Sequence, residues 1–264
     1  MATAVVHYTA AAMTDRGRKR SSNEDAFGYS VEHGVYLVCD GMGGAAAGEI
    51  ASSVAVEEVL RLVTERRSAG EAGEVVVPAL AAEAVVVANE AIHSRSQRNT
   101  RLSGMGTTLV GLLTGLREDE RRAWIFHVGD SRCYRLRKQS IVQCTEDHSL
   151  VEEQIRLGRM TPAEAARSPL RNVITRALGT QASVTPDVLE AEVEPNDIFL
   201  LCSDGLTREL SDEKIESILN AGLSASSGSP ADLANLDELC TSLVKAANKA
   251  GGNDNITCLL VRVE

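Results

Sequence analysis

The sequence predicts an α+β fold with mainly antiparallel sheets. Short apolar runs rich in β-branched residues are joined by only a few turn-like residues, and such short connections favour antiparallel pairing. Two long helical patterns follow one another directly, so helices and strands come in blocks and do not alternate strictly. The expected strands are residues 27–30, 35–39, 107–114, 123–128, 133–136, 141–144, 188–193, 198–202 and 257–263.

The expected helices follow from apolar residues that recur with helical spacing. Residues 48–66 and 76–95 form the first two patterns, and residues 233–250 form a third with an apolar stripe. The segment Thr161–Glu164 has the sequence of a capping box, with proline at the first helical position, and predicts the start of a short helix. Residues 221–232 are rich in Ser, Gly and Ala and are expected to form a surface loop.

Composition excludes several classes of protein. The chain has 264 residues, of which 44% are hydrophobic and 24% charged, as in an ordinary globular protein. The net charge of −10 argues against non-specific binding to nucleic acid, and the basic run between Arg16 and Arg20 is too short to reverse it. No run approaches the ~18 apolar residues that a membrane span needs. The N-terminal segment has its basic residues after its apolar part, the wrong order for a secretory signal.

The cysteines predict a reducing compartment. The six cysteines include no C-x-x-C pair, and most of them lie inside apolar runs. This pattern is typical of buried thiols and does not resemble a disulfide framework or a zinc site. We therefore expect a cytoplasmic protein.

A glycine-rich stretch follows the second expected strand. Gly41, Gly43 and Ala46 have the spacing of a dinucleotide-binding fingerprint between a strand and a helix. Two features argue against a dinucleotide-binding site here. A second helix follows where the fingerprint expects a strand, and Asp40 at the mouth of the loop would repel a pyrophosphate unless a cation lay between them.

Acidic residues recur where apolar runs end or begin. Each taken alone has a simple explanation, because Asp and Asn favour turns and helix caps. Together they predict carboxylates that converge at one edge of a pair of sheets, and such a group needs counter-charge. Oxygen ligands without His or Cys suit magnesium or manganese better than zinc. The acids concerned are Glu24, Asp25, Asp40, Asp130, Asp204 and Asp254.

An ordered set of motifs carries a family resemblance. It resembles the motifs of the metal-dependent protein serine/threonine phosphatases, the PPM or protein phosphatase 2C family, in its bacterial form. The resemblance implies a four-layer α-β-β-α sandwich of two mainly antiparallel sheets flanked by helices. It also implies a single catalytic domain over residues 1–264, with a flap subdomain at about residues 145–181. The motifs are RGRKRSSNEDAF, VCDGMGG, GMGTTL, VGDSRCYRL, TEDHSLVEEQI, NVITRALG, LLCSDGLT and GGNDNIT.

The resemblance assigns the core metal ligands. Asp40 resembles the carboxylate that bridges two metals, and Gly41 resembles the residue whose carbonyl binds one of them. Asp204 and Asp254 are similar to ligands of the first metal.

Four further roles are implied in the same way. Asp130 is similar to a ligand of a third, weaker metal that it shares with Asp204. Glu24 and Asp25 match acids in the inner or water-mediated shell of the second metal. Arg20 matches the arginine that binds the substrate phosphate.

The implied activity is hydrolysis of phosphoserine and phosphothreonine in proteins, in opposition to serine/threonine kinases. A metal-bridging hydroxide at a dinuclear Mn²⁺ or Mg²⁺ centre would attack phosphorus in line, without a phosphoenzyme. The expected partners are phosphorylated proteins, including a cognate kinase, with no nucleic acid and no membrane, and the protein is expected to be a monomer. A catalytically silent phosphoprotein-binding module is the alternative, but it would be expected to lose some of the metal acids.

One departure concerns the proton donor. Many family members have His where this chain has Met42, and bacterial members with Met there often have His at the position of Ala45. Since neither is His here, metal-bound water or His148 would have to substitute. A structural role in the flap is the expected one for His148.

Overall fold

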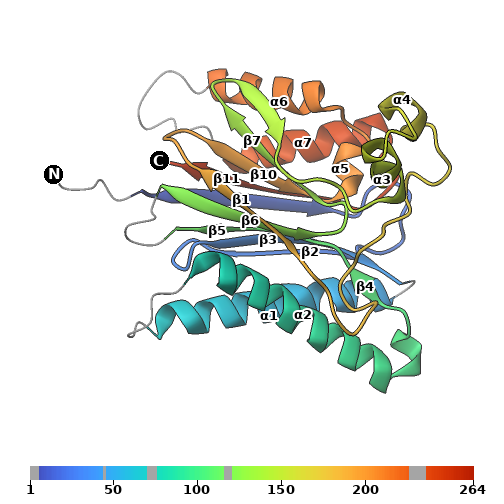
Figure 1. The fold of residues 1–264 in the computed structure, drawn as a ribbon. Helices are drawn as coiled ribbons and strands as arrows, with labels where there is room; N and C mark the ends of the chain where they lie inside the picture. Colours follow the sequence, from blue (N-terminus) through green and yellow to red (C-terminus); the bar gives the residue numbers. More distant parts are fainter. Residues whose placement is uncertain (1–5, 44–45, 70–75, 116–120, 226–235) are drawn as a thin grey trace.

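Two antiparallel sheets lie face to face between two layers of helices in the computed structural model, which describes residues 6–43, 46–69, 76–115, 121–225 and 236–264 (Figure 1). All pairs among the strands of these described ranges are antiparallel. The first sheet has the order β1 (Tyr8–Asp15), β11 (Ile256–Val263), β10 (Ile198–Cys202), β7 (Arg132–Arg137) and β8 (Ser140–Gln143). The second has the order β2 (Asp25–Ser30), β3 (Val35–Met42), β5 (Leu109–Thr114), β6 (Arg122–Val128) and β9 (Asp187–Glu192), and β4 (Gly106–Thr107) pairs with β3.

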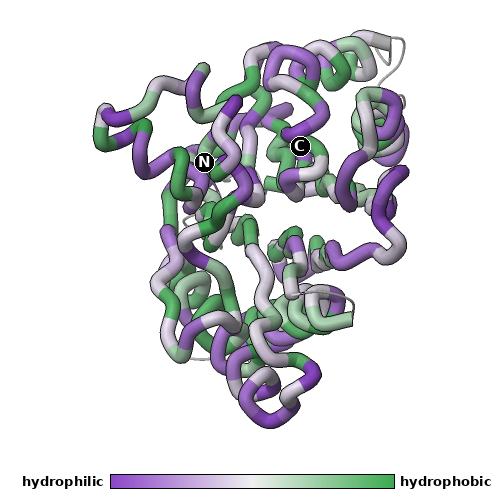
Figure 2. Tube along the Cα trace, turned by 90° about the vertical axis from the view of Figure 1, so that its right-hand side faces the viewer, coloured by the Kyte–Doolittle hydropathy of each residue, from purple (hydrophilic) through white to green (hydrophobic). Residues whose placement is uncertain are grey.

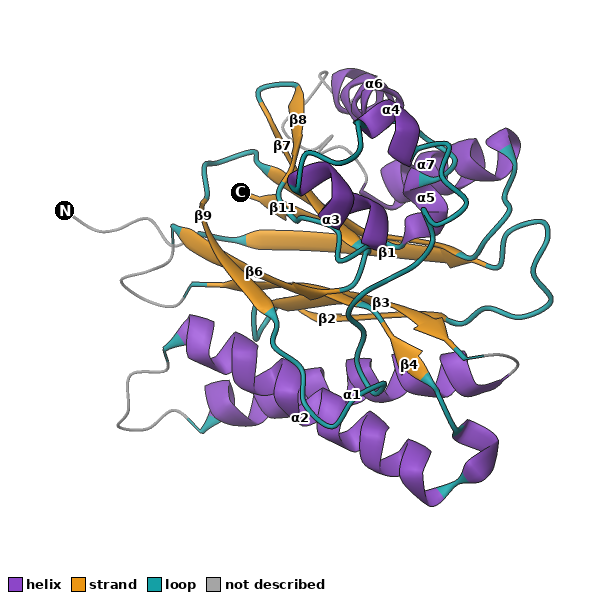
Figure 3. Cartoon of the chain, turned by 45° about the vertical axis from the view of Figure 1, so that its right-hand side comes forward, coloured by secondary structure: helices purple, strands orange, loops and turns teal. Residues whose placement is uncertain are grey.

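The long helices form the outer layers. Helices α1 (Ala46–Ser68) and α2 (Val77–Arg98) cover the second sheet, and α6 (Asp212–Ala225) and α7 (Leu236–Ala250) cover the first (Figure 3). A 3₁₀ helix (Thr100–Leu102) follows α2. The α-β-β-α sandwich expected from the family resemblance is confirmed.

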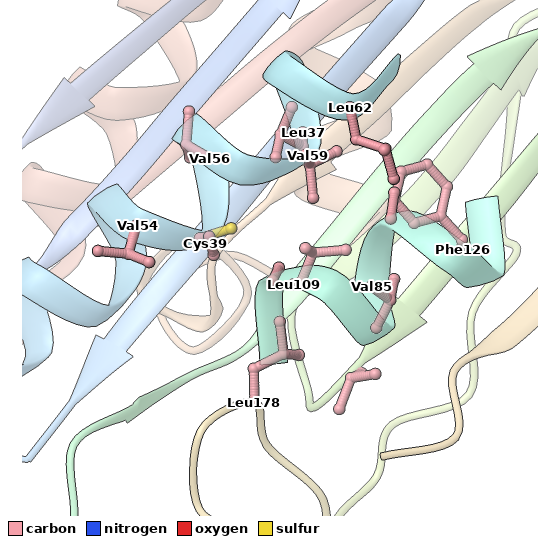
Figure 4. Packing of buried hydrophobic residues seen from close by; sticks show 14 of the residues in the cluster. Leu37, Cys39, Val54, Val56, Val59, Leu62, Val85, Leu109, Phe126 and Leu178 are labelled. Carbon is pink, nitrogen blue, oxygen red and sulfur yellow. The ribbon is translucent and has the colours of Figure 1, made fainter. Parts of the chain in front are cut away.

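Apolar packing joins the layers in three clusters, one between the sheets and one beneath each helical layer. Figure 4 shows α1 and α2 packing against β3, β5 and β6, with Val59, Val85 and Phe126 among the contacting side chains. Leu178, which comes from the region expected as the flap, also enters this core. Figure 2 shows hydrophilic and hydrophobic residues mixed along the chain, and in α7 the buried residues Leu236, Leu239, Cys240 and Leu243 recur with helical spacing on the face that packs on the sheet.

The expected strands and long helices are present, with three differences. β1 was not predicted, because its alanine-rich sequence has weak strand propensity, and pairing along the whole of β11 stabilises it instead. Helix α6 was not predicted either, and the loop expected over residues 221–232 was wrong at its start because α6 extends to Ala225. Residues 226–232 of that expected loop lie outside the described residues. The expected strand 107–114 is divided between β4 and β5.

The segment from residue 145 to residue 181, here named the flap segment, contains two short helices. These are α3 (Leu150–Arg156) and α4 (Pro162–Ala165), and they lie beside the short helix α5 (Asp204–Thr207) (Figure 3). The capping box at Thr161 is confirmed, because its hydroxyl accepts from the Glu164 N–H while the Glu164 carboxylate accepts from the Thr161 N–H. Within the described part of the chain, no helix is both long and apolar enough to cross a membrane.

Candidate metal centre

The pairing of β2 with β3 creates the first acidic pair. Asp25 lies directly opposite Asp40 in the register of these strands. The Asp40 N–H donates to the Thr108 hydroxyl at 3.0 Å, and the Asp40 carbonyl accepts from the Thr108 N–H at 2.9 Å. The backbone of Asp40 is therefore fixed by β3 and by the residue that precedes β5, and its carboxylate is held at the end of the sheet.

Asp25 is buried, and only one of its two carboxylate oxygens accepts hydrogen bonds. Its Oδ2 accepts from the Ser203 hydroxyl at 2.8 Å and from the Thr257 hydroxyl at 2.6 Å, and both donors come from the opposite sheet region. Its Oδ1 is buried without a hydrogen-bond partner. Burial raises the pKa of Asp25 to about 6, and the two hydroxyl bonds offset part of that effect.

The first sheet supplies two more acids because β10 and β11 are neighbours. Asp204 directly follows Ser203 at the end of β10 and begins α5, and Asp254 precedes β11. The Asp204 Oδ1 is buried without a hydrogen-bond partner. Burial raises the pKa of Asp204 to about 8, and the negative charge of Asp130 contributes in the same direction.

These acids act on one another at the end of the sandwich. Burial raises the pKa of Asp40 well above its usual range, and the charges of four further aspartates raise it more. Carboxylates in such a group cannot all stay ionised without counter-charge, and two of their buried oxygens have no donor. An all-oxygen group with this deficit of positive charge fits a hard divalent cation. The four aspartates are Asp25, Asp204, Asp130 and Asp254.

Glu24 precedes Asp25 and Gly41 follows Asp40, and a backbone hydrogen bond joins Glu24 to Gly41. The Gly41 N–H donates to the Glu24 carbonyl at 3.1 Å, and that carbonyl also accepts from the Ser52 hydroxyl at 2.6 Å. A Cβ added to Gly41 would collide with the backbone carbonyls of Gly48 and Glu24, so only glycine fits. Burial raises the pKa of Glu24.

Asp130 lies on a loop that the flap segment supports. Gly129 before it has φ +109°, a conformation that favours glycine. The Gly129 N–H donates to His148 Nδ1 at 3.1 Å, and the His148 N–H donates to the Gly129 carbonyl at 2.9 Å. His148 Nε2 lies 3.3 Å from Asp187, and its ring stacks on His127. With both ring nitrogens engaged, His148 has the structural role that we expected.

Two arginines contact the acids. Arg20 is half exposed, and its Nη2 lies 2.8 Å from Asp254 Oδ2. Arg208, which the sequence analysis missed, forms an ion pair with Asp204 and lies 3.3 Å from Asp254 Oδ2. The available signal was its position four residues after Asp204, which is the spacing of a helical ion pair.

A cleft of about 720 Å³ separates the centre from the flap segment. Arg20, Asp130, Asp204, Asp254 and Arg208 lie on one side of it. The flap segment provides the other side through Asp147, Ser149, Val151, Glu152, Ile155, Pro162, Ala165, Ala166, Arg171 and Asn172. The cleft therefore offers both acidic and basic groups to a charged ligand.

The glycine-rich stretch does not form a dinucleotide site. β3 is antiparallel to β5, the next long strand of its sheet, whereas the fingerprint needs a parallel crossover. Met42 ends β3, and its methyl group lies near Gly106 of β4. Ala45 lies outside the described residues.

Comparison with known proteins identifies the class. The family model for protein phosphatase 2C matches residues 14–248. The serine/threonine phosphatase stp of Listeria welshimeri is 37% identical over 94% of this chain and 93% of its own. A crystal structure of the Mycobacterium tuberculosis serine/threonine phosphatase PstP/Ppp superposes with a TM-score of 0.83, at 34% identity, over 97% of this chain and 99% of that one. A structure of the PstP catalytic domain in complex with two manganese ions gives a TM-score of 0.81 at 32% identity, over 98% of this chain and 99% of that one.

The chain belongs to the protein phosphatase 2C family. It is thus a metal-dependent protein serine/threonine phosphatase, as the motifs predicted.

Proposed function

We propose that this enzyme hydrolyses phosphoserine and phosphothreonine in proteins at a dinuclear manganese or magnesium centre and opposes serine/threonine kinases. The observation that carries the proposal is the group of five aspartates described above. The charges of four of them raise the pKa of the fifth, Asp40, and two buried oxygens of the group have no hydrogen-bond partner. The manganese ions in the related PstP structure support the choice of metal.

Each residue of the centre would have its own role in metal binding. Asp40 would bridge the two ions, Gly41 would offer its carbonyl, and Asp204 and Asp254 would hold the first ion. Bound ions would supply counter-charge to the phosphate and activate water for in-line attack. Glu24 and Asp25 would complete the second ion's shell.

Arg20 would bind the substrate phosphate. Its guanidinium lies in the cleft beside Asp254, and nearly half of its side-chain surface is exposed to a ligand. Planar guanidinium groups suit phosphate because they donate two parallel hydrogen bonds. Arg20 therefore orients the phosphate and neutralises its charge.

The flap segment would select among phosphoproteins. It faces the centre across the cleft, and its Leu157, Leu170 and Val173 are exposed. Phosphorylated proteins, among them a cognate kinase, are the proposed partners, and the enzyme would act as a monomer. All six cysteines are free, which fits a reducing compartment such as the cytoplasm.

The decisive test measures phosphate release from a phosphothreonine peptide. Wild-type enzyme should release phosphate with manganese and stop when a chelator is added. An Asp254→Asn variant is the matched control, because it removes one proposed ligand charge with little change of shape. Absence of release with either manganese or magnesium would reject the proposal and favour a silent binding module.

A further inference from the structure

Arg208 occupies the position between two carboxylates that come from different sheets. It caps the C-terminus of the one-turn helix α5 and forms an ion pair with Asp204 Oδ2. The same Nη2 lies 3.9 Å from Asp130 Oδ2. Asp130 and Asp204 are the pair expected to share the weaker third metal, so the guanidinium lies where that ion would bind.

Arg208 contacts Asp130, Asp204 and also Asp254 through their Oδ2 atoms, and Asp254 Oδ2 lies 3.3 Å from its guanidinium. Arg208 uses the Oδ2 of Asp204, while the buried Oδ1 of this carboxylate has no hydrogen-bond partner. Asp204 can therefore hold Arg208 with one oxygen and a core metal ion with the other.

Arg20 provides a comparison within the same cleft. It contacts Asp254 Oδ2 and lines the cleft, but no ion pair links it to Asp130 or Asp204 among the described residues. Arg171 lines the cleft from the flap segment, and its guanidinium donates to the Ser168 carbonyl. Of these three arginines, only Arg208 bridges the third-metal carboxylates.

We propose that the guanidinium of Arg208 replaces the third metal ion, so that the enzyme binds the two core ions and no third. This inference rests on the proposed function, because it presupposes the dinuclear centre. A third metal ion beside Asp130 would have to bind within a few ångströms of the positively charged Arg208 guanidinium. At that distance the repulsion between the two cations is strong and salt screens it poorly. Since the arginine is covalently attached, this counter-charge is present at any free manganese concentration.

The experiment counts bound manganese. Equilibrium dialysis, with free ion followed by its electron paramagnetic resonance signal, should give about two ions per wild-type chain up to millimolar manganese. Arg208→Ala should bind about one more ion in that range. Arg208→Lys, which keeps the charge, and Arg171→Ala, which removes an arginine from the same cleft, should both match wild type. Asp130→Ala added to Arg208→Ala should abolish the extra ion.

Each outcome decides between the hypotheses. A third ion on wild type, or no additional ion on Arg208→Ala, would overturn the replacement by arginine and leave the dinuclear proposal intact. An extra ion that persists in the double variant would also overturn it, since Asp130 would not be a ligand. Failure of wild type to bind any manganese would reject the dinuclear centre and this inference together. Circular dichroism of each variant shows whether the count refers to folded protein.

Discussion

The metal centre and the flap segment face each other across one cleft but are built in opposite ways. The acids of the centre lie at the ends of buried strands and are fixed by hydrogen bonds from both sheets. The flap segment has two short helices, three large apolar side chains that are exposed, and isolated bridges at Ser149 and Leu178. The contrast fits the proposed roles, because metal ligands need a rigid framework and a segment that selects among phosphoproteins should open at low cost.

The largest expected effect comes from Asp40→Asn. Losing the charge of the proposed bridging carboxylate should weaken the binding of both ions at once and reduce turnover by about a thousandfold or more. Isothermal titration should show manganese affinity falling in parallel. Unchanged manganese affinity would refute the bridging role, even if turnover were lost.

A pair of glycine substitutions compares the rigidity of the two regions. Gly41→Ala should lower the free energy of unfolding by about 3 kcal/mol, because its Cβ would collide with two backbone carbonyls. Gly158→Ala in the flap segment should cost only about 1 kcal/mol, because its Cβ has open space and only the φ of +67° is unfavourable. Urea unfolding measures both. Equal costs would mean that the centre is no more rigid than the flap segment.

The acids of the centre should make the metal-free protein less stable as pH rises. The folded pKa of Asp204, about 8, exceeds its unfolded value of about 3.9, so the folded state binds more protons between these limits. The free energy of unfolding should therefore fall from pH 6.5 to pH 8 in chelator. Asp204→Asn should reduce this slope, and saturating manganese should remove it. A metal-free protein that gains stability over this range would contradict the prediction.

Shortening the flap segment should affect substrate choice more than chemistry. Ser149 pairs with Ile174, so the residues between them can be replaced by a short glycine-serine linker. We expect kcat/KM for a phosphoprotein to fall about tenfold and that for nitrophenyl phosphate to change about twofold. Equal losses on both substrates would show that the segment supports the centre itself.

The smallest effect is expected from Met42→His. A general acid contributes about 10²-fold to 10⁴-fold when fully effective, but an unoptimised one should give a several-fold gain. The gain should be larger for a phosphothreonine peptide than for nitrophenyl phosphate, whose leaving group departs without a proton. Ala45→His gives the same comparison at the neighbouring position. No gain with either variant would show that proton donation does not limit turnover.

The sequence revealed the acids of the centre because each stands at the boundary of an apolar run. Asp40 and Asp204 follow strands that are recognisable from their β-branched and leucine-rich sequences. Their positions at strand ends predicted that they converge at one edge of a pair of sheets. The strand order that brings them together, with β10 beside β11, is seen only in the structure.

The features that the sequence did not predict, strand β1 and the contact of Arg208 with Asp130, depend on tertiary contacts. β1 has too few β-branched residues to be recognised before its pairing with β11 is known. Arg208 looks like an ordinary helical ion-pair partner of Asp204, and its proximity to Asp130 arises because the loop after β6 meets the end of β10. Neither contact leaves a local pattern in the sequence.

The register of β2 and β3 has an evolutionary consequence. It places Asp25 opposite Asp40, and like charges in such positions destabilise a sheet unless a cation intervenes. A descendant released from selection for catalysis would become more stable by replacing either aspartate with a neutral residue. In such a lineage, substitutions would therefore remove the Asp25–Asp40 pair early, while the apolar layers around it would be retained.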